Sequence, residues 1–129
     1  MKKEIENSKL RGARVLVVED QYLIADDLRR MLTACGVEVL GPIGRLDAAR
    51  AIAAAERIDA ALLDIDLKGA PVYPLVEDLR QRSVPYAYLS GYCREMVPAD
   101  FAAGTHLEKP IQANALAAAL QGLLMGASA

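Results

Sequence analysis

The sequence predicts an α/β domain in which helices cover both faces of a doubly wound sheet of five parallel strands. The first observation is that five short apolar runs alternate with segments whose apolar residues recur at helical spacing. The second is that Ala60–Leu63 is apolar at every position and leads directly into Asp64. Such a run is typical of a strand buried on both faces, as in a parallel sheet covered by helices. In these sheets, ligands bind at the carboxyl ends of the strands, where Asp64 lies.

Length and composition limit the classes of protein that fit. A chain of 129 residues forms one domain, and 53% hydrophobic and 25% charged residues are typical of a globular protein. The net charge of -2 argues against a nucleic-acid-binding protein, which would carry a basic face. No apolar stretch could span a membrane or follow the charged start as a signal peptide. Cys35 and Cys93 lie far apart and have no metal-binding spacing. This cysteine usage is typical of a reducing compartment, so we expect a cytoplasmic protein.

The first half of the chain supplies three strands and two helices. Residues 1–12 are polar and charged, and we expect them to form a loose N-terminal extension. The β-branched run Arg14–Val18 predicts a central strand, and the helical pattern over 21–35 ends at Gly36. A strand, an alanine-rich helix and a strand follow: Val37–Leu40, Leu46–Glu56 and Ile58–Leu63.

The second half repeats the alternation with one interruption. We expect a loop over 68–71 and a helix from Val72 to Arg82. In residues 92–103, Pro98 would break any full-length helix. The remaining strands and the last helix are Pro85–Leu89, Thr105–Glu108 and a segment from about Leu116 to Gly126. The domain therefore covers residues 13–126, and residues 127–129 form a C-terminal tail.

Polar side chains follow four of the five apolar runs. Glu19 and Asp20 follow the first run and Asp64 the third, so the sheet brings three carboxylates to one edge. Carboxylates this close repel one another, and Mg²⁺, which prefers oxygen ligands, relieves the repulsion. With the metal bound, Asp64 could attack phosphorus as a nucleophile. Ser90 and Lys109 follow the fourth and fifth runs, and they offer a hydroxyl and an ammonium to a phosphoryl group.

Each of these groups also has an ordinary structural explanation. An Asp at the end of a strand often caps a turn, and Asp64 would do only that in a purely structural interpretation. Glu19–Asp20 would then cap the next helix. Lys109 would be a surface lysine, Ser90–Gly91 a common turn, and His106 a packed histidine. The functional interpretation is favoured because the polar groups each follow a different apolar run, in an order that one known architecture requires.

Glu19–Asp20, Asp64, Ser90 and Lys109–Pro110, in this order and over nearly the whole chain, resemble the receiver domain of bacterial two-component response regulators. The resemblance implies a flavodoxin-like (βα)5 fold with strand order 2-1-3-4-5. It also implies that Asp64 accepts phosphate from a phosphohistidine. Asp20 would be the main acidic ligand of Mg²⁺, and Glu19 would act through a metal-bound water.

The same resemblance assigns the remaining site residues. Asp66 would give its backbone carbonyl to the metal, while Ser90 and Lys109 would bind the phosphoryl group. The peptide bond between Lys109 and Pro110 would be cis.

A narrower resemblance is carried by residues 85–92, Pro-Tyr-Ala-Tyr-Leu-Ser-Gly-Tyr, which are similar to the signature of the FAT GUY receivers of alphaproteobacteria. Residues 72–74 and 41–42 also match that group. Its members are often single-domain regulators, and some have an irregular fourth helix. Tyr88 and Leu89 stand where the signature favours Phe and Ala.

The switch residues depart from the common receiver pattern. His106, three residues before Lys109, stands where many receivers carry a Tyr or Phe that reports phosphorylation. We expect Ser90 to move toward the phosphoryl oxygens, where its hydroxyl gains a charge-assisted hydrogen bond. The signal would then leave mainly through Gly91 and Tyr92, and less through His106.

Asp64-Ile65-Asp66 also resembles the DxD nucleophile motif of haloacid-dehalogenase-like aspartyl-phosphate phosphatases. Those enzymes carry the motif on their first strand and an acidic pair after the lysine. Here the acidic pair comes first, nothing acidic follows Lys109, and Lys68 replaces the usual Thr or Val. A nucleotide-binding module is excluded because no glycine-rich loop joins a strand to a helix.

The sequence therefore predicts a single-domain response regulator that is phosphorylated on Asp64 with Mg²⁺ and is not an enzyme beyond its own phosphotransfer and dephosphorylation. Its expected partners are a histidine kinase or histidine phosphotransfer protein and a downstream protein target. We expect no nucleic-acid or membrane partner, and a monomer or weak homodimer. Phosphate relay, phosphate draining and direct target binding all remain open.

Overall fold

The computed structural model of the chain describes residues 10–67, 69–91, 97–102 and 104–127. Within them, five parallel strands form one sheet in the spatial order β2-β1-β3-β6-β7. The strands are β1 (Arg14–Val18), β2 (Glu38–Ile43), β3 (Ala60–Asp64), β6 (Tyr86–Ser90) and β7 (Thr105–Glu108). Numbered along the chain within this sheet, that is the order 2-1-3-4-5, so the predicted fold class is confirmed.

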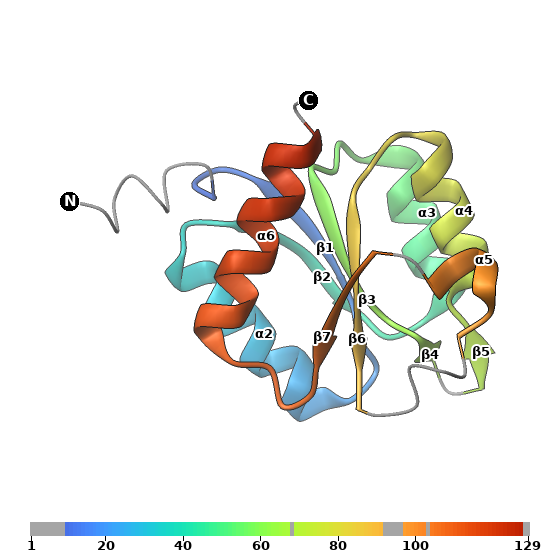
Figure 1. Cartoon of the computed structure of the whole chain (residues 1–129), viewed down its shortest axis with the longest axis horizontal. Coiled ribbons are helices and arrows are strands. Elements are labelled where there is room, and N and C mark those ends of the chain that lie inside the picture. The colour runs from blue at the N-terminus through green and yellow to red at the C-terminus, as the bar shows by residue number, and fades with distance from the viewer. Residues whose placement is uncertain (1–9, 68, 92–96, 103, 128–129) are drawn as a thin grey trace.

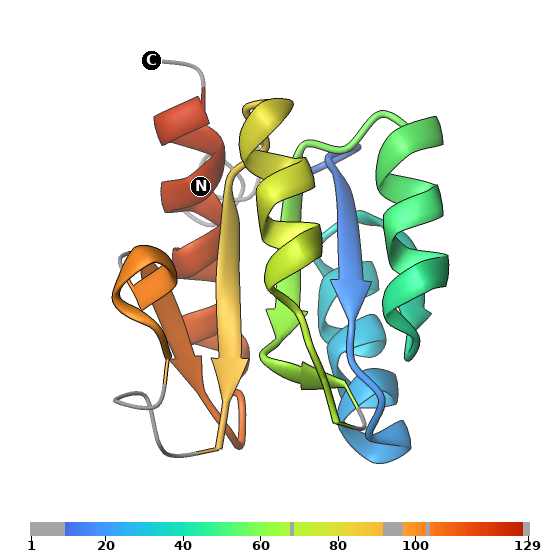
Figure 2. The same cartoon turned by 90° about the vertical axis from the view of Figure 1, so that its right-hand side faces the viewer.

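Helices cover both faces of the sheet (Figure 1). They are α2 (Tyr22–Ala34), α3 (Leu46–Ala55), α4 (Tyr73–Gln81), α5 (Ala99–Ala102) and α6 (Ala113–Ala127). Helices α2 and α6 lie on one face, and α3, α4 and α5 lie on the other (Figures 1 and 2). No helix in the described part of the chain is long and apolar enough to cross a membrane.

The sheet separates two hydrophobic cores. Successive side chains of a strand point to opposite faces, so Leu62 packs in the core under α2 and α6, and Leu63 in the core under α3 and α4. Both leucines are fully buried. This is why the third apolar run shows no polar alternation, and it fixes the position of Asp64 at the end of β3.

Strand β2 extends further than the sequence predicts. We expected it to end at Leu40 because Gly41 and Pro42 follow, but it continues to Ile43. The register shifts between Leu16 and Val18 of β1, so β2 accommodates an extra residue as a bulge. Gly41 is needed there, because its φ is +110° and a Cβ atom would lie 2.8 Å from a backbone oxygen of β1. The peptide bond before Pro42 is cis.

The expected loop after β3 is a small hairpin. Strands β4 (Asp66–Leu67) and β5 (Ala70–Pro71) pair antiparallel. Leu67 is buried in the core under α3 and α4, which holds the hairpin against the domain. The turn contains Gly69 with a φ of +85°, a conformation that the sequence pattern alone does not reveal.

Described structure continues past both ends of residues 13–126. Leu10, assigned above to the loose extension, is fully buried in the core under α2 and α6. The amide of Gly12 donates a hydrogen bond to the Gly36 carbonyl at 2.8 Å, which fastens this segment to the end of α2. At the other end, α6 continues to Ala127. The polar N-terminal segment therefore contains one apolar residue, Leu10, that packs in the core.

Replacing Leu10 by Ala should lower the free energy of unfolding by about 2–5 kcal/mol, the cost of a cavity in a packed core. Leu23 is the matched control, because it is 78% exposed on α2 and the same substitution there removes no buried contact. Urea unfolding of both variants measures the difference. Equal losses would show that Leu10 is not an anchor of the domain.

Candidate functional site

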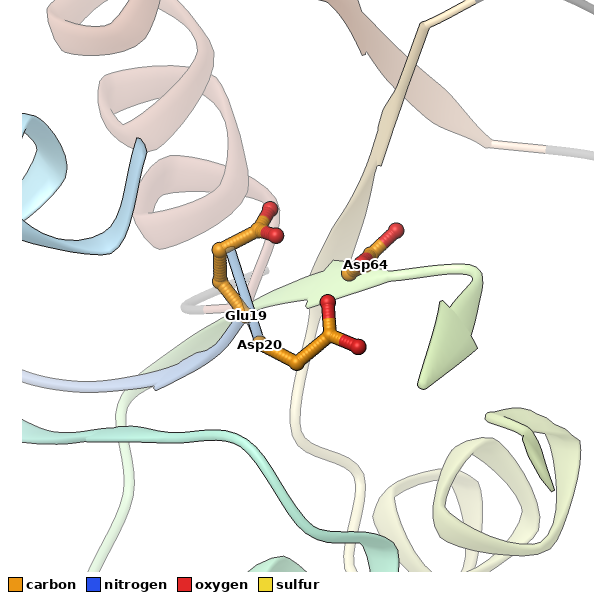
Figure 3. Close-up of side chains that lie close together, drawn as sticks. All are labelled: Glu19, Asp20 and Asp64. Atoms are coloured by element: carbon orange, nitrogen blue, oxygen red, sulfur yellow. The ribbon is translucent and has the colours of Figure 1, made fainter. Parts of the chain in front are cut away.

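Three carboxylates meet at the carboxyl ends of β1 and β3 (Figure 3). Glu19 and Asp20 follow β1 directly, and Asp64 is the last residue of β3. The two strands are neighbours in parallel register, with Val18 opposite Leu63, so the residues that follow come to the same edge. One carboxylate oxygen from each of the three lies within 4.8 Å of the others. This donor set, all oxygen and all anionic, fits Mg²⁺.

A lysine that follows the edge strand β7 neutralises part of this negative charge. Lys109 follows β7, and its Nζ lies 2.9 Å from Oε1 of Glu19 and 3.6 Å from Oδ1 of Asp64. The amide of Lys109 donates a hydrogen bond to the carbonyl of Ser90 at 2.8 Å, which fixes the start of the lysine relative to β6. One cation therefore lies within ion-pair distance of two anions, so the site keeps a net negative charge that a bound metal ion would offset.

Ser90 completes the edge of the site. It is the last residue of β6 and is buried. Its Oγ has no hydrogen-bond partner among the residues that the structure describes. Buried hydroxyls are normally hydrogen-bonded, so this one is available to a ligand. Gly91, the next residue, is exposed, and a Cβ atom there would meet nothing within 4 Å.

The surroundings of Asp64 oppose its ionisation. Burial raises the pKa of its carboxyl from the ordinary 3.8 to about 7, and the negative charge of Glu19 adds to the effect. Lys109 acts in the opposite direction, and Asp20 raises the pKa further. The pKa of Asp64 stays raised overall, so the charge of one lysine does not compensate for burial beside two other carboxylates. A cation bound here would favour the ionised form.

Glu19 and Asp20 differ although they are adjacent in sequence. Glu19 is 2% exposed, and its second oxygen, Oε2, accepts a hydrogen bond from the amide of Gln21 at 3.0 Å. Both of its oxygens thus have protein partners, one the Lys109 ammonium and the other an amide. Both residues line an open pocket of about 350 Å³, but Asp20 is only partly buried. Asp20 is therefore the carboxylate more accessible to an ion.

The other predicted site residues are placed as follows. Asp66 begins β4, next to the site in sequence, and its backbone pairs with Pro71. The bond between Lys109 and Pro110 is cis. His106 lies in β7, and its Nε2 is 3.0 Å from the carbonyl oxygen of Ala102 in α5. Tyr92 lies outside the described residues.

Sequence reasoning missed the surroundings of His106. Its ring lies 5.1 Å from the ring of Tyr88, its register partner in β6. The Tyr88 hydroxyl is buried without a hydrogen-bond partner among the described residues, and burial raises its pKa. The alternation of polar and apolar residues gave no signal for this contact, because it depends on the register between β6 and β7.

The chain matches the family model described as "Response regulator receiver domain" over residues 15–121. No curated protein sequence is similar enough to count as a match.

Solved structures agree with the family. SdrG from Sphingomonas melonis Fr1 is 32% identical, with a TM-score of 0.79 over 88% of this chain and 97% of that chain. The receiver domain of the sensor histidine kinase PA1611 from Pseudomonas aeruginosa PAO1, described with magnesium in its active-site cleft, is 26% identical, with a TM-score of 0.75 over 88% of this chain and 98% of that chain.

The response regulator PhyR from Brucella abortus shares the fold, with a TM-score of 0.81 at 23% identity over 97% of this chain. The match covers 53% of that protein, so this chain spans about half of its length. Together, the family match, the strand order and the cluster of acidic residues with one lysine show that the chain belongs to the response regulator receiver domains, which are signalling domains rather than conventional enzymes.

Proposed function

We propose that the chain is the phosphoacceptor of a two-component system or phosphorelay and that Asp64 is the residue phosphorylated. The observation that carries this proposal is the position of Lys109, whose ammonium lies within ion-pair distance of both Glu19 and Asp64. A cation held there by a buried anion is ready to bind a phosphoryl oxygen. The unpartnered hydroxyl of Ser90 at the end of the adjacent strand supports the same function.

In the proposed reaction, an Oδ atom of Asp64 forms a bond to phosphorus while the bond from phosphorus to the partner's histidine nitrogen breaks. The electron pair of that bond leaves with the imidazole. Lys109 and Ser90 bind the non-bridging oxygens of the phosphoryl group, whose charge would otherwise be repelled by the carboxylates. Glu19 keeps Lys109 in place through the 2.9 Å ion pair.

Mg²⁺ would be held by Asp20 and Asp64, with the Asp66 carbonyl as a further ligand and Glu19 acting through water. The divalent ion supplies charge neutralisation between the carboxylates and the phosphoryl oxygens. The accessibility of Asp20 and the two protein partners of Glu19 support this division of roles. Magnesium in the cleft of the PA1611 receiver domain supports the choice of metal.

The proposed partners are a histidine kinase or a histidine phosphotransfer protein, and a downstream protein that binds the phosphorylated form. Membership of the receiver family and the likeness to SdrG support them. The match of residues 85–92 to the FAT GUY signature supports assignment to that group. The cytoplasmic location and the oligomeric state stay predictions.

Incubation with a small acyl phosphate and Mg²⁺ should add one phosphoryl group, and mass spectrometry should locate it on Asp64. Asp64 is the described carboxylate that both lies near Lys109 and ends a strand, so Asp64→Asn should abolish labelling. Excess chelator should also abolish it. Labelling that persists in the variant or without metal would contradict the proposal.

Asp20→Asn should weaken Mg²⁺ binding more than Glu19→Gln, because a direct ligand loses more than a residue acting through water. Calorimetric titration with Mg²⁺ measures both variants on the same scale. A larger loss in Glu19→Gln would show that the two acidic residues have the opposite roles.

Asp64→Asn should also stabilise the protein in Mg²⁺-free buffer, and more at pH 8 than at pH 5. The pKa of Asp64 is about 7 when folded and near its ordinary 3.8 when unfolded, so the folded state holds a proton that the unfolded chain has released. The stability of the wild type therefore falls as pH rises through this window. Urea unfolding at both pH values measures the effect. A gain that does not depend on pH would contradict the raised pKa.

Tyr92→Ala should reduce the difference in partner affinity between phosphorylated and unphosphorylated protein more than His106→Ala does. A phosphate-induced change shifts an equilibrium only through contacts that differ between the two states, and we expect most of them at Tyr92. Calorimetry against the cognate partner ranks the variants. The opposite ranking would assign the switch to His106 and its bond to α5.

A further inference from the structure

The end of β2 packs against the two acidic residues that follow β1. The carbonyl of Ile43, the last residue of β2, accepts a hydrogen bond from the amide of Glu19 at 2.9 Å. The next residue, Gly44, lies so close to Asp20 that a Cβ atom built on it would be 3.3 Å from Cα and 3.4 Å from Cβ of Asp20. Residues 43–44 therefore support both acidic residues from the side of β2.

The backbone conformation of Gly44 does not itself require a glycine. Its φ lies outside the range from +20° to +160° that side chains disfavour, whereas the φ of Gly41 is +110°. What leaves no room for a side chain at position 44 is the approach of Asp20. A methyl group would fit there only if one of the two segments gave way by a few tenths of an ångström.

Both segments are held from their other sides. Glu19 is 2% exposed, and its carboxylate pairs with the Lys109 ammonium at 2.9 Å. Gly44 lies between β2 and α3, whose first residue, Leu46, packs against the core under α3 and α4. Asp20 is only partly buried and is the least firmly held of these residues. A methyl group at position 44 would therefore displace mainly Asp20, and it would press on the base of that side chain, which cannot rotate away.

The position of Asp20 matters to a small divalent ion. Its side chain points from the end of β1 toward Asp64 (Figure 3), and oxygens of Glu19, Asp20 and Asp64 lie within 4.8 Å of one another. Mg²⁺ requires short bonds in nearly ideal octahedral geometry, whereas Ca²⁺ accepts longer bonds and a less regular arrangement. A displacement of Asp20 by a few tenths of an ångström in any direction therefore costs more binding energy for Mg²⁺ than for Ca²⁺.

We propose that Gly44 is a positioning residue for the metal site. Because position 44 has no side chain, the end of β2 lies directly against Asp20 and keeps its carboxylate where it can share a Mg²⁺ ion with Asp64. This inference rests on the proposed function, which assigns Mg²⁺ to these carboxylates. Gly44 acts through the backbone and Cβ of Asp20, so it sets the affinity and the preference for Mg²⁺ rather than the stability of the fold.

Gly44→Ala is the smallest substitution that tests this role. Calorimetric titration should show Mg²⁺ binding about tenfold more weakly than in the wild type, a typical effect of changing a group that orients a metal ligand. The affinity for Ca²⁺ should fall less, because Ca²⁺ tolerates a displaced ligand. Unchanged Mg²⁺ affinity, or equal losses for the two ions, would overturn the positioning role.

Gly122→Ala is the matched control. Gly122 is exposed in α6, its φ also suits a side chain, and a Cβ atom there would meet nothing within 4 Å. This substitution also reduces the freedom of the unfolded chain, and it should leave Mg²⁺ affinity unchanged. A loss of Mg²⁺ affinity equal to that of Gly44→Ala would show that position 44 has no special role.

Urea unfolding separates positioning from a structural role. In Mg²⁺-free buffer, the midpoint for Gly44→Ala should stay close to that of the wild type. Addition of Mg²⁺ should raise the midpoint less in the variant, because a weaker ligand stabilises the folded state less. A lower midpoint without metal, combined with the full rise on adding Mg²⁺, would show that Gly44 serves only the stability of the fold.

The metal-free protein distinguishes this inference from the proposed function. Absence of Mg²⁺ binding by the wild type would contradict the proposed metal site, and amide hydrogen exchange would then decide the role of Gly44. The amide of Glu19, bonded to Ile43, should exchange faster in Gly44→Ala. The amide of Asp59, which donates to the Arg14 carbonyl at 2.8 Å at the other end of β1, should not change. An unchanged Glu19 rate, or equal acceleration of both amides, would overturn the support of the acidic residues by Gly44.

Discussion

The burial of Glu19 beside Asp64 is the constraint on which the rest of the site depends. Two carboxylates near each other in a poorly solvated place repel, and the ammonium of Lys109 is the described cation within ion-pair distance of both. That compensation is incomplete, because the pKa of Asp64 remains raised to about 7. The folded domain therefore carries an electrostatic cost at its own site. Binding of a metal ion and a phosphoryl group relieves that cost, which couples ligand binding to the stability of the domain.

The parallel sheet makes this arrangement possible. Glu19, Asp64 and Lys109 are far apart in the sequence, and each follows or ends a strand whose carboxyl end points to the same edge. The two hydrophobic cores fix the positions of the strands. The strands in turn hold the carboxylates of Glu19 and Asp64 close together although the two charges repel each other. The bulge in β2 helps to fix Glu19, because the carbonyl of Ile43, the last residue of β2, accepts a hydrogen bond from the amide of Glu19 at 2.9 Å.

The parts predictable from sequence were those set by apolar runs. β1 and β7 have the predicted bounds, and the strand order followed from the family resemblance. The end of β2 was not predictable because a positive φ at Gly41 and a shift in register let the strand continue past residues that usually stop one. Leu10 was missed because a single apolar residue in a polar segment has no period. The convergence of the carboxylates was predicted, but the two protein partners of Glu19 were not, because they depend on side-chain conformation.

The attachment of α5 belongs to the class of features that pattern reasoning cannot reach. Phe101, Arg80 and His106 come from three separate elements, and their contacts arise from the relative placement of α4, β7 and a helix of four residues. Each contact is weak at an exposed position, so none of them determines the fold.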